Sequence, residues 1–66
     1  MQAIINGETH LFAPSSTLAT LVEALALDVR KVAIEQNLTI IPRSLYGQTP
    51  IADGDRIEIV QFIGGG

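Results

Sequence analysis

The chain has 66 residues, no cysteine, a single histidine and a formal net charge of −3. A chain this short forms one domain, and a deep catalytic cleft would remove packing that so small a core needs. The lack of cysteine excludes disulfides, thiolate metal sites and cysteine nucleophiles. The excess of acidic residues argues against a nucleic-acid-binding protein and is compatible with a basic protein partner.

Hydrophobic residues make up 47% of the chain, a high share for a small soluble protein. No apolar run reaches the roughly 20 residues of a membrane span, and residues 1–3 lack the basic region of a signal peptide. We therefore expect a cytoplasmic protein that binds neither membrane nor nucleic acid. Part of the surplus hydrophobic surface is expected to form a protein interface.

The first elements along the chain are a predicted β-hairpin. Residues 1–5 form the first predicted strand, and residues 9–12 form its return strand. Asn6 and Gly7 between them are a strong hairpin signal, because both residue types tolerate positive φ.

A helix is predicted next, over residues 17–25. Ser15 and Ser16 follow a proline and are candidate N-caps. Apolar residues then recur at helical spacing and form one stripe: Leu18, Leu21, Val22 and Leu25. A helix this short is not stable alone, so we expect it to pack against a sheet.

Two short strands are predicted after the helix, over residues 32–35 and 38–41. Gln36 and Asn37 are the predicted turn between them. Pro42 stops the second strand, and a loop with one helical turn is expected after it.

The last predicted strand covers residues 56–63 and is the most β-prone stretch of the chain. A tight turn at residues 53–55 precedes it. The element order is therefore β-β-α-β-β-β, which predicts an α+β fold, with one main helix packed on one face of a mixed sheet of about five strands. The first and last strands are the most apolar and are expected to be central neighbours.

Alternation along the strands assigns side chains to the two faces of this sheet. If Ile57 and Ile59 face the helix, then Val60 and Phe62 face away from it, and so does Ile4 of the first strand. The sequence thus predicts an exposed apolar patch of Ile4, Val60 and Phe62, which we interpret as a partner-binding patch. The alternative explanation is that a small sheet simply leaves some apolar residues outside.

The three closing glycines, Gly64, Gly65 and Gly66, are the feature that points to chemistry. Glycines add no side-chain packing and are costly to order, so a flexible tail is expected after the last strand. The α-carboxylate of Gly66 on so thin a chain suits a narrow channel on another protein. There it can attack the α-phosphate of a nucleotide and become an activated acyl group. A frayed terminus or a linker remnant is the alternative interpretation.

The remaining polar residues have structural explanations. Asp53 and Asp55 flank a glycine and suit a turn better than a metal site, since two carboxylates without a third ligand bind a metal weakly. His10 is expected at the surface or at a sheet edge. No catalytic residue and no metal ligand is therefore predicted within the chain.

Several segments, taken in order over the whole length, carry a resemblance to a known family. They are Asn6-Gly7-Glu8, Val32-Ala33-Ile34-Glu35-Gln36-Asn37, Ile41-Pro42-Arg43-Ser44, and the stretch from Asp53-Gly54-Asp55 through Phe62-Ile63 to the closing glycines. This pattern resembles the ubiquitin-like β-grasp proteins and, more narrowly, the ThiS-type sulfur carriers of thiamine biosynthesis. The resemblance implies a β-grasp domain over residues 1–63 and a flexible C-terminal glycine tail over residues 64–66.

The resemblance also implies a reaction cycle. In that family an E1-like activating enzyme uses ATP and magnesium to adenylate the C-terminal glycine, here Gly66. A sulfur donor such as a cysteine desulfurase then supplies the sulfur of a thiocarboxylate, and thiazole synthase takes that sulfur into thiazole phosphate. Gly64, Gly65 and Gly66 would enter the active sites of these partners. The carrier is a protein co-substrate rather than an enzyme, and it binds no cofactor of its own.

Two alternatives remain open from the sequence. The small subunit of molybdopterin synthase also ends in two glycines and uses a thiocarboxylate, but it is usually longer and often has a proline just before the glycines, where this chain has Gln61-Phe62-Ile63. The other alternative is a β-grasp interaction module that keeps the exposed patch and has an inert tail.

Overall fold

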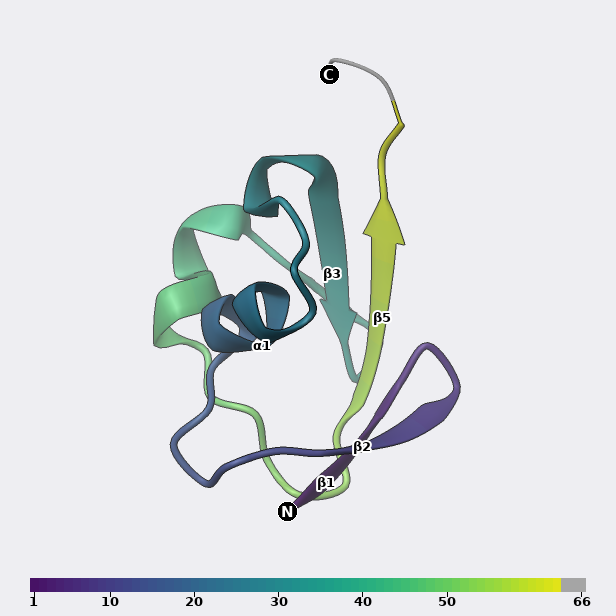
Figure 1. Cartoon of the computed structure of the whole chain (residues 1–66), viewed down its shortest axis with the longest axis vertical. Helices are drawn as coiled ribbons and strands as arrows, with labels where there is room; N and C mark the ends of the chain where they lie inside the picture. The colour runs from purple at the N-terminus through teal and green to yellow at the C-terminus, as the bar shows by residue number, and fades with distance from the viewer. Residues whose placement is uncertain (64–66) are drawn as a thin grey trace.

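Five strands form one mixed sheet in the computed structural model, which describes residues 1–63. The predicted tail, residues 64–66, lies outside the described residues. The strand order is β2-β1-β5-β3-β4, and the α-helix of the described residues lies to one side of the sheet (Figure 1). The elements are β1 Gln2–Ile5, β2 Glu8–Leu11, α1 Leu18–Ala24, β3 Val32–Gln36, β4 Thr39–Ile41 and β5 Arg56–Gln61, with short 3-10 helices η1 Val29–Lys31 and η2 Arg43–Gln48. The predicted α+β fold is confirmed.

β5 is the central strand of the sheet. It runs parallel to β1 and antiparallel to β3, with which it pairs from Val32 opposite Gln61 to Gln36 opposite Ile57. The predicted adjacency of the first and last strands is confirmed. β5 ends at Gln61 rather than at Ile63 as predicted, because β3 begins at the residue opposite Gln61.

The N-terminal end of α1 is closed by a capping box. The Thr17 hydroxyl accepts a hydrogen bond from the Thr20 N–H at 3.3 Å, and the Thr20 hydroxyl accepts one from the Thr17 N–H at 2.8 Å. The prediction that Ser15 or Ser16 caps the helix is therefore wrong. The Ser16 carbonyl instead accepts a hydrogen bond from the Ile51 N–H at 3.0 Å, which ties the approach to the helix to a distant loop.

The C-terminal end of α1 is a Schellman motif. The Leu27 N–H donates to the Val22 carbonyl at 3.1 Å, and the Ala26 N–H donates to the Glu23 carbonyl at 3.0 Å. Ala26 has a φ of 58°, in the left-handed region that favours glycine. The helix therefore stops after seven residues. Within residues 1–63 no helix is long and apolar enough to cross a membrane.

The core lies between α1 and the covered face of the sheet. The side chains of Ala3 and Ile5 from β1 and of Ile57 from β5 are buried there, as the alternation of the strands predicts. The buried hydrophobic residues are Ala3, Ile5, Leu18, Leu21, Val22, Val32, Ile34, Tyr46, Ile51 and Ile57. A single layer of apolar side chains thus joins the helix to three neighbouring strands.

The turn between β3 and β4 lies one residue later than predicted. Asn37 and Leu38 are its two central residues, with φ values of 51° and 71°. Gln36 is instead the last residue of β3. Its side-chain amide donates to the Pro50 carbonyl at 3.1 Å and to Asp55 Oδ2 at 2.9 Å, and these contacts hold Gln36 in the strand. The predicted helical turn after β4 is present as η2, whereas η1 was not predicted.

Candidate functional site

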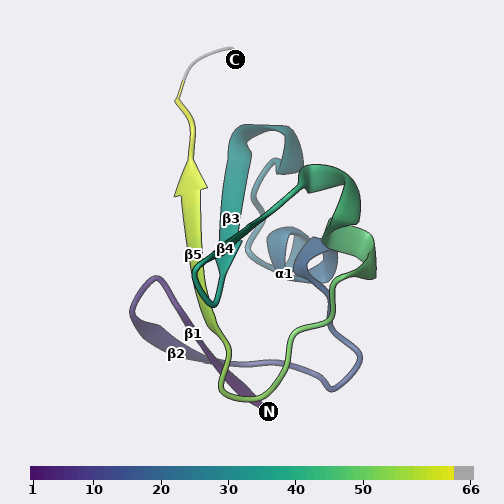
Figure 2. The same ribbon diagram turned by 180° about the vertical axis from the view of Figure 1, so that it is seen from behind.

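The end of β5 is the part of the described chain that leads to the glycines. Phe62 follows β5 directly and is still held to the sheet, because its N–H donates to the Lys31 carbonyl at 2.7 Å. The side chain of Ile63 is fully exposed. Figure 2 shows that this end of β5 lies at the opposite end of the molecule from the N-terminus. The sheet therefore holds the chain extended up to the residues that precede the glycines.

The predicted apolar patch is present on the open face of the sheet in an altered form. Val60 is 57% exposed and Phe62 is 49% exposed. Ile4 shares their face, as predicted, and is half-buried. However, Ile4 pairs with Arg56, four positions before Val60 along β5, so it does not adjoin the other two residues.

Ala33 and Ile40 lie beside Val60 in place of Ile4. Ala33 of β3 is directly opposite Val60, and Ile40 of β4, which is 74% exposed, lies on the same face. A hollow of about 150 Å³ on this face is lined by Ala33, Ile34, Glu35, Ile40, Glu58 and Val60. We name Ala33, Ile40, Val60 and Phe62 the open-face patch. Continuing the strand alternation from β3 into β4 is the sequence signal that would have found Ile40.

Two carboxylates lie next to the open-face patch. Glu35 of β3 and Glu58 of β5 are directly opposite each other, and both line the hollow. Neither belongs to an ion pair within residues 1–63. Like charges opposite each other across a sheet repel, so a cation arriving between them is favoured. This face therefore suits a partner surface that is both apolar and basic.

Asp55 has a structural role at the turn before β5. Its carboxylate is buried, and it accepts hydrogen bonds from the Ala52 N–H at 2.8 Å, Gln36 Nε2 at 2.9 Å and Asn37 Nδ2 at 2.9 Å. Burial raises the pKa of Asp55, but the three hydrogen bonds outweigh it and hold this pKa below its ordinary value. Asp53 accepts a backbone hydrogen bond from β1 at 2.7 Å. The two carboxylates thus stabilise the turn that precedes β5.

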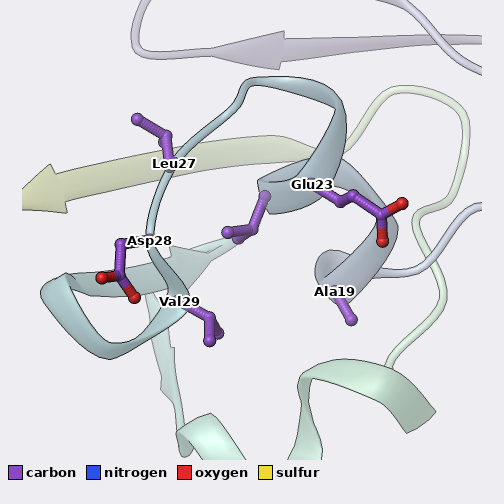
Figure 3. A pocket seen from close by; sticks show the side chains of 6 residues that line it. Ala19, Glu23, Leu27, Asp28 and Val29 are labelled. Carbon is purple, nitrogen blue, oxygen red and sulfur yellow. The ribbon is translucent and has the colours of Figure 1, made fainter.

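A shallow pocket of about 400 Å³ lies between α1 and the segment that leads into η1 (Figure 3). Its lining is Ala19, Val22, Glu23, Leu27, Asp28 and Val29. Figure 3 shows the carboxylates of Glu23 and Asp28 on opposite sides of the pocket. Hydrogen bonds from Arg30 engage Asp28 and lower its pKa to about 2. This pocket therefore brings no pair of catalytic groups together.

Comparison with known sequences gives one consistent family. The model of the ThiS family matches residues 2–66. The chain is 33% identical to the sulfur carrier protein ThiS of Escherichia coli over the full length of both chains. It is also 52% identical, over its whole length, to a thiazole synthase of Paramagnetospirillum magneticum, but it spans only 20% of that protein.

Comparison with solved structures agrees. The crystal structure of the thiamine biosynthesis protein ThiS from Geobacter metallireducens matches this chain with a TM-score of 0.84 and 30% sequence identity, and the match covers both chains completely. The five-stranded mixed sheet with its one main helix is thus the ubiquitin-like β-grasp fold of that protein.

Proposed function

The chain belongs to the ThiS family, the sulfur carriers of thiamine biosynthesis, and we propose that it carries sulfur as a thiocarboxylate on Gly66. The chain has no cysteine, so it offers no thiol on which sulfur could travel. The ThiS-type carriers that this chain resembles hold sulfur on a C-terminal glycine, and Gly66 matches that position. The protein acts as a co-substrate that is consumed and regenerated, and not as an enzyme.

The proposed cycle begins on an E1-like activating enzyme, which supplies the bound ATP and magnesium. A carboxylate oxygen of Gly66 attacks the α-phosphorus of ATP, pyrophosphate leaves, and an acyl-adenylate forms. The persulfide of a sulfur donor such as a cysteine desulfurase then attacks the carbonyl carbon through its outer sulfur and displaces AMP, which leaves an acyl disulfide. A thiol reductant supplies the two electrons that cleave the S–S bond, so the donor is released as a thiol and the carried sulfur stays on Gly66. The resulting thiocarboxylate gives its sulfur to thiazole synthase.

The observation that carries this proposal is the position of the glycines directly after the extended end of β5. The hydrogen bond from Phe62 to Lys31 holds the strand up to residue 62, and residues 64–66 are glycines that bring no side chain into a partner's active site. A rigid strand followed by side-chain-free residues suits delivery of a carboxylate into a narrow channel. Thiazole synthase is supported as the recipient because a protein of that name contains a segment 52% identical to this chain.

The open-face patch is the proposed contact with the activating enzyme. Val60 lies on β5 and Phe62 follows β5 directly, in the segment that leads to the glycines, so a protein that binds the tail also lies near them. Glu35 and Glu58 add negative charge to this face, and the chain carries a net charge of −3. A basic rim around an apolar surface on the enzyme would complement both features.

The decisive experiment follows the mass of the carrier. The protein ending at Gly66 is incubated with the activating enzyme, ATP and magnesium, and its intact mass is measured. We expect a species heavier by one AMP and, after addition of desulfurase, cysteine and a thiol reductant, a species in which one oxygen is replaced by sulfur. A matched protein with one alanine added after Gly66 should keep the fold and form neither species. If the extended protein is adenylated as well, the assignment of Gly66 is wrong. If the native protein is not adenylated either, the chain is an interaction module.

A further inference from the structure

Within residues 1–63, one edge of β5 has no partner strand near the end of the strand. The ladder to β3 uses the backbone groups of the even-numbered residues: the Phe62 N–H donates to Lys31, and the Arg56 carbonyl accepts from the Asn37 N–H, both at 2.7 Å. In an antiparallel pair, the residues between these bonded positions direct their N–H and C=O groups to the opposite edge. The backbone groups of Gln61 therefore point away from β3, and those of Ile63 do so where the chain continues extended.

β1 occupies this opposite edge only along the first half of β5. Its last backbone contact is the Asn6 N–H, which donates to the Ile57 carbonyl at 2.9 Å. The side-chain amide of Asn6 then bonds both backbone groups of Ile59. Beyond that point the chain turns through Gly7 into β2 and runs back.

The edge at Gln61 and Ile63 is therefore open within residues 1–63. Figures 1 and 2 both show β5 continuing past the tip of the β1–β2 hairpin, with no other element beside it on that side. Gln61 presents one backbone donor and one backbone acceptor at this edge, and Ile63 adds a second of each where the chain continues extended. An edge of this kind is a template for another strand, and proteins usually protect such edges with charged residues, proline or a bulge. Residues 60–63 are Val, Gln, Phe and Ile, which contain none of the protecting residues.

We infer that an extended segment of the activating enzyme pairs with the open edge at the end of β5 and the two residues after it, Gln61 to Ile63, and continues the sheet where β1 leaves it. The inference rests on the proposed function, since it takes the activating enzyme as the protein that receives Gly66. An extended strand is the occupant that the chemistry requires, because alternating N–H and C=O groups are satisfied by another strand's backbone. A second copy of this chain is disfavoured, because two molecules with a net charge of −3 repel each other.

Strand addition at this edge would set the register of the tail. Backbone hydrogen bonds at Gln61 and Ile63 would fix which residues of the partner strand lie opposite them. Gly66 would then always lie the same number of residues beyond a defined position on the enzyme. The open-face patch presents side chains from the same strand at right angles to this edge. The enzyme would thus recognise β5 through its backbone on one side and through Val60 and Phe62 on its open face.

The direct test is hydrogen exchange of single amides. The carrier is exchanged free and in complex with the activating enzyme and ATP, quenched, released and measured by NMR. In the free carrier we expect the Phe62 amide to be protected and the Gln61 and Ile63 amides to exchange freely. In the complex, the protection of Gln61 and Ile63 should rise by at least about tenfold. The same exchange at high carrier concentration without enzyme reports on pairing between two copies.

A backbone variant provides an independent test. Ile63→Pro removes the N–H at the open edge, and Ile63→Ala retains that N–H while removing most of the side chain. We expect Ile63→Pro to weaken binding to the activating enzyme at least about tenfold more than Ile63→Ala does, with equal thermal stability of the two variants.

The outcomes separate this inference from the proposed function. If Gly66 of the native protein is adenylated while Gln61 and Ile63 exchange in the complex as they do in the free carrier, strand addition is wrong and the carrier function stands. Equal binding of Ile63→Pro and Ile63→Ala overturns strand addition as well, and so does protection that depends only on carrier concentration. If native Gly66 is not adenylated, the carrier function fails and this inference fails with it.

Discussion

The side chain of Asn6 bonds both backbone groups of Ile59, a residue 53 positions away in the sequence. Asn6 Oδ1 accepts from the Ile59 N–H at 2.7 Å, and Asn6 Nδ2 donates to the Ile59 carbonyl at 3.2 Å. At a φ of 50° the backbone of Asn6 has already left the strand direction. Its side-chain amide therefore takes the place of the next peptide group of β1, and it extends the parallel pairing to the middle of β5.

Replacing Asn6 should destabilise the protein in two separable steps. Asn6→Gly keeps the turn conformation and removes only the two hydrogen bonds, so we expect the free energy of unfolding to fall by about 1–2 kcal/mol. Asn6→Ala removes the same hydrogen bonds and keeps a Cβ in the left-handed region, which alanine adopts less readily than asparagine or glycine. We therefore expect it to be less stable than Asn6→Gly by about 1 kcal/mol. Urea unfolding followed by circular dichroism measures both. An Asn6→Gly variant as stable as the native protein would show that the bridge to Ile59 contributes nothing.

A stabilising substitution is expected at the end of α1. Ala26 adopts a φ of 58° in the Schellman motif, where glycine carries no steric penalty. We expect Ala26→Gly to raise the free energy of unfolding by up to about 1 kcal/mol, the relief of strain being partly offset by the greater freedom of glycine in the unfolded chain. The matched control is Ala24→Gly, two residues earlier at the last residue of α1, which should lower the free energy of unfolding by up to about 1 kcal/mol. Equal effects of the two substitutions would contradict the role assigned to Ala26.

The buried carboxylate of Asp55 predicts a pH dependence of stability. Its pKa is lower in the folded protein than the value of about 3.9 expected for an unfolded chain. The carboxylate therefore stabilises the fold above the unfolded pKa, and this contribution is lost as the pH falls through the folded pKa. Asp55→Asn replaces one carboxylate oxygen with an NH2 group, which then faces at least one of the three donors, and should cost about 1–3 kcal/mol at neutral pH.

Urea unfolding at a series of pH values from about 7 to about 2 tests this prediction. The native protein should lose more stability on acidification than Asp55→Asn does. Asp28 also contributes stability that is lost on acidification, because hydrogen bonds from Arg30 lower its pKa to about 2. The comparison is therefore repeated in an Asp28→Asn background. Identical acid profiles for the native protein and Asp55→Asn would rule out a role for this carboxylate.

Much of the fold was predictable because it depends on local patterns. Strand alternation placed Ile57 inside and Val60 and Phe62 outside, and the structure agrees. The glycine tail is a feature of the sequence alone. The bridge from Asn6 and the hydrogen bonds to Asp55 were not predictable, since both join segments far apart in the chain.

The two misplaced features have the same physical cause. The helix cap lies at Thr17 because Ser16 is engaged by Ile51, and the β3–β4 turn begins at Asn37 because Gln36 is held in β3 by Asp55. In each case two neighbouring residues have similar local preferences, and a contact with a distant residue determines which of them takes the cap or turn position. Composition and spacing give no information about such contacts.

The Tyr46 hydroxyl satisfies a buried backbone group in β3. Tyr46 is 3% exposed, and its hydroxyl accepts a hydrogen bond from the Ile34 N–H at 3.1 Å. Tyr46→Phe preserves the packing and removes this acceptor, so we expect a loss of about 1–2 kcal/mol. Hydrogen exchange provides the specific measurement: the Ile34 amide should exchange faster in the variant by more than the global change in stability explains. Exchange of Ile34 that only follows the global change would argue against this hydrogen bond.

The open-face patch can be tested with two chemically identical substitutions. Phe62→Asp places a charge at the proposed contact with the activating enzyme, and we expect binding to weaken by at least about 1–2 kcal/mol, because the carboxylate would be desolvated without a partner. Leu38→Asp is the control. Leu38 is 86% exposed and lies in the β3–β4 turn, at the other end of β3 from Phe62. Its φ of 71° also suits aspartate better than leucine.

Titration calorimetry with the activating enzyme compares the two variants with the native protein, and circular dichroism checks that both are folded. We expect native affinity for Leu38→Asp and a loss only for Phe62→Asp. Because Glu35 and Glu58 lie beside the patch, native binding should also weaken as salt is added. Equal losses for both variants would mean that the added negative charge, wherever it stands on the molecule, is what the enzyme rejects. Native affinity for Phe62→Asp would move the enzyme's contact away from the open face and leave the edge of β5 as the surface through which the carrier is recognised.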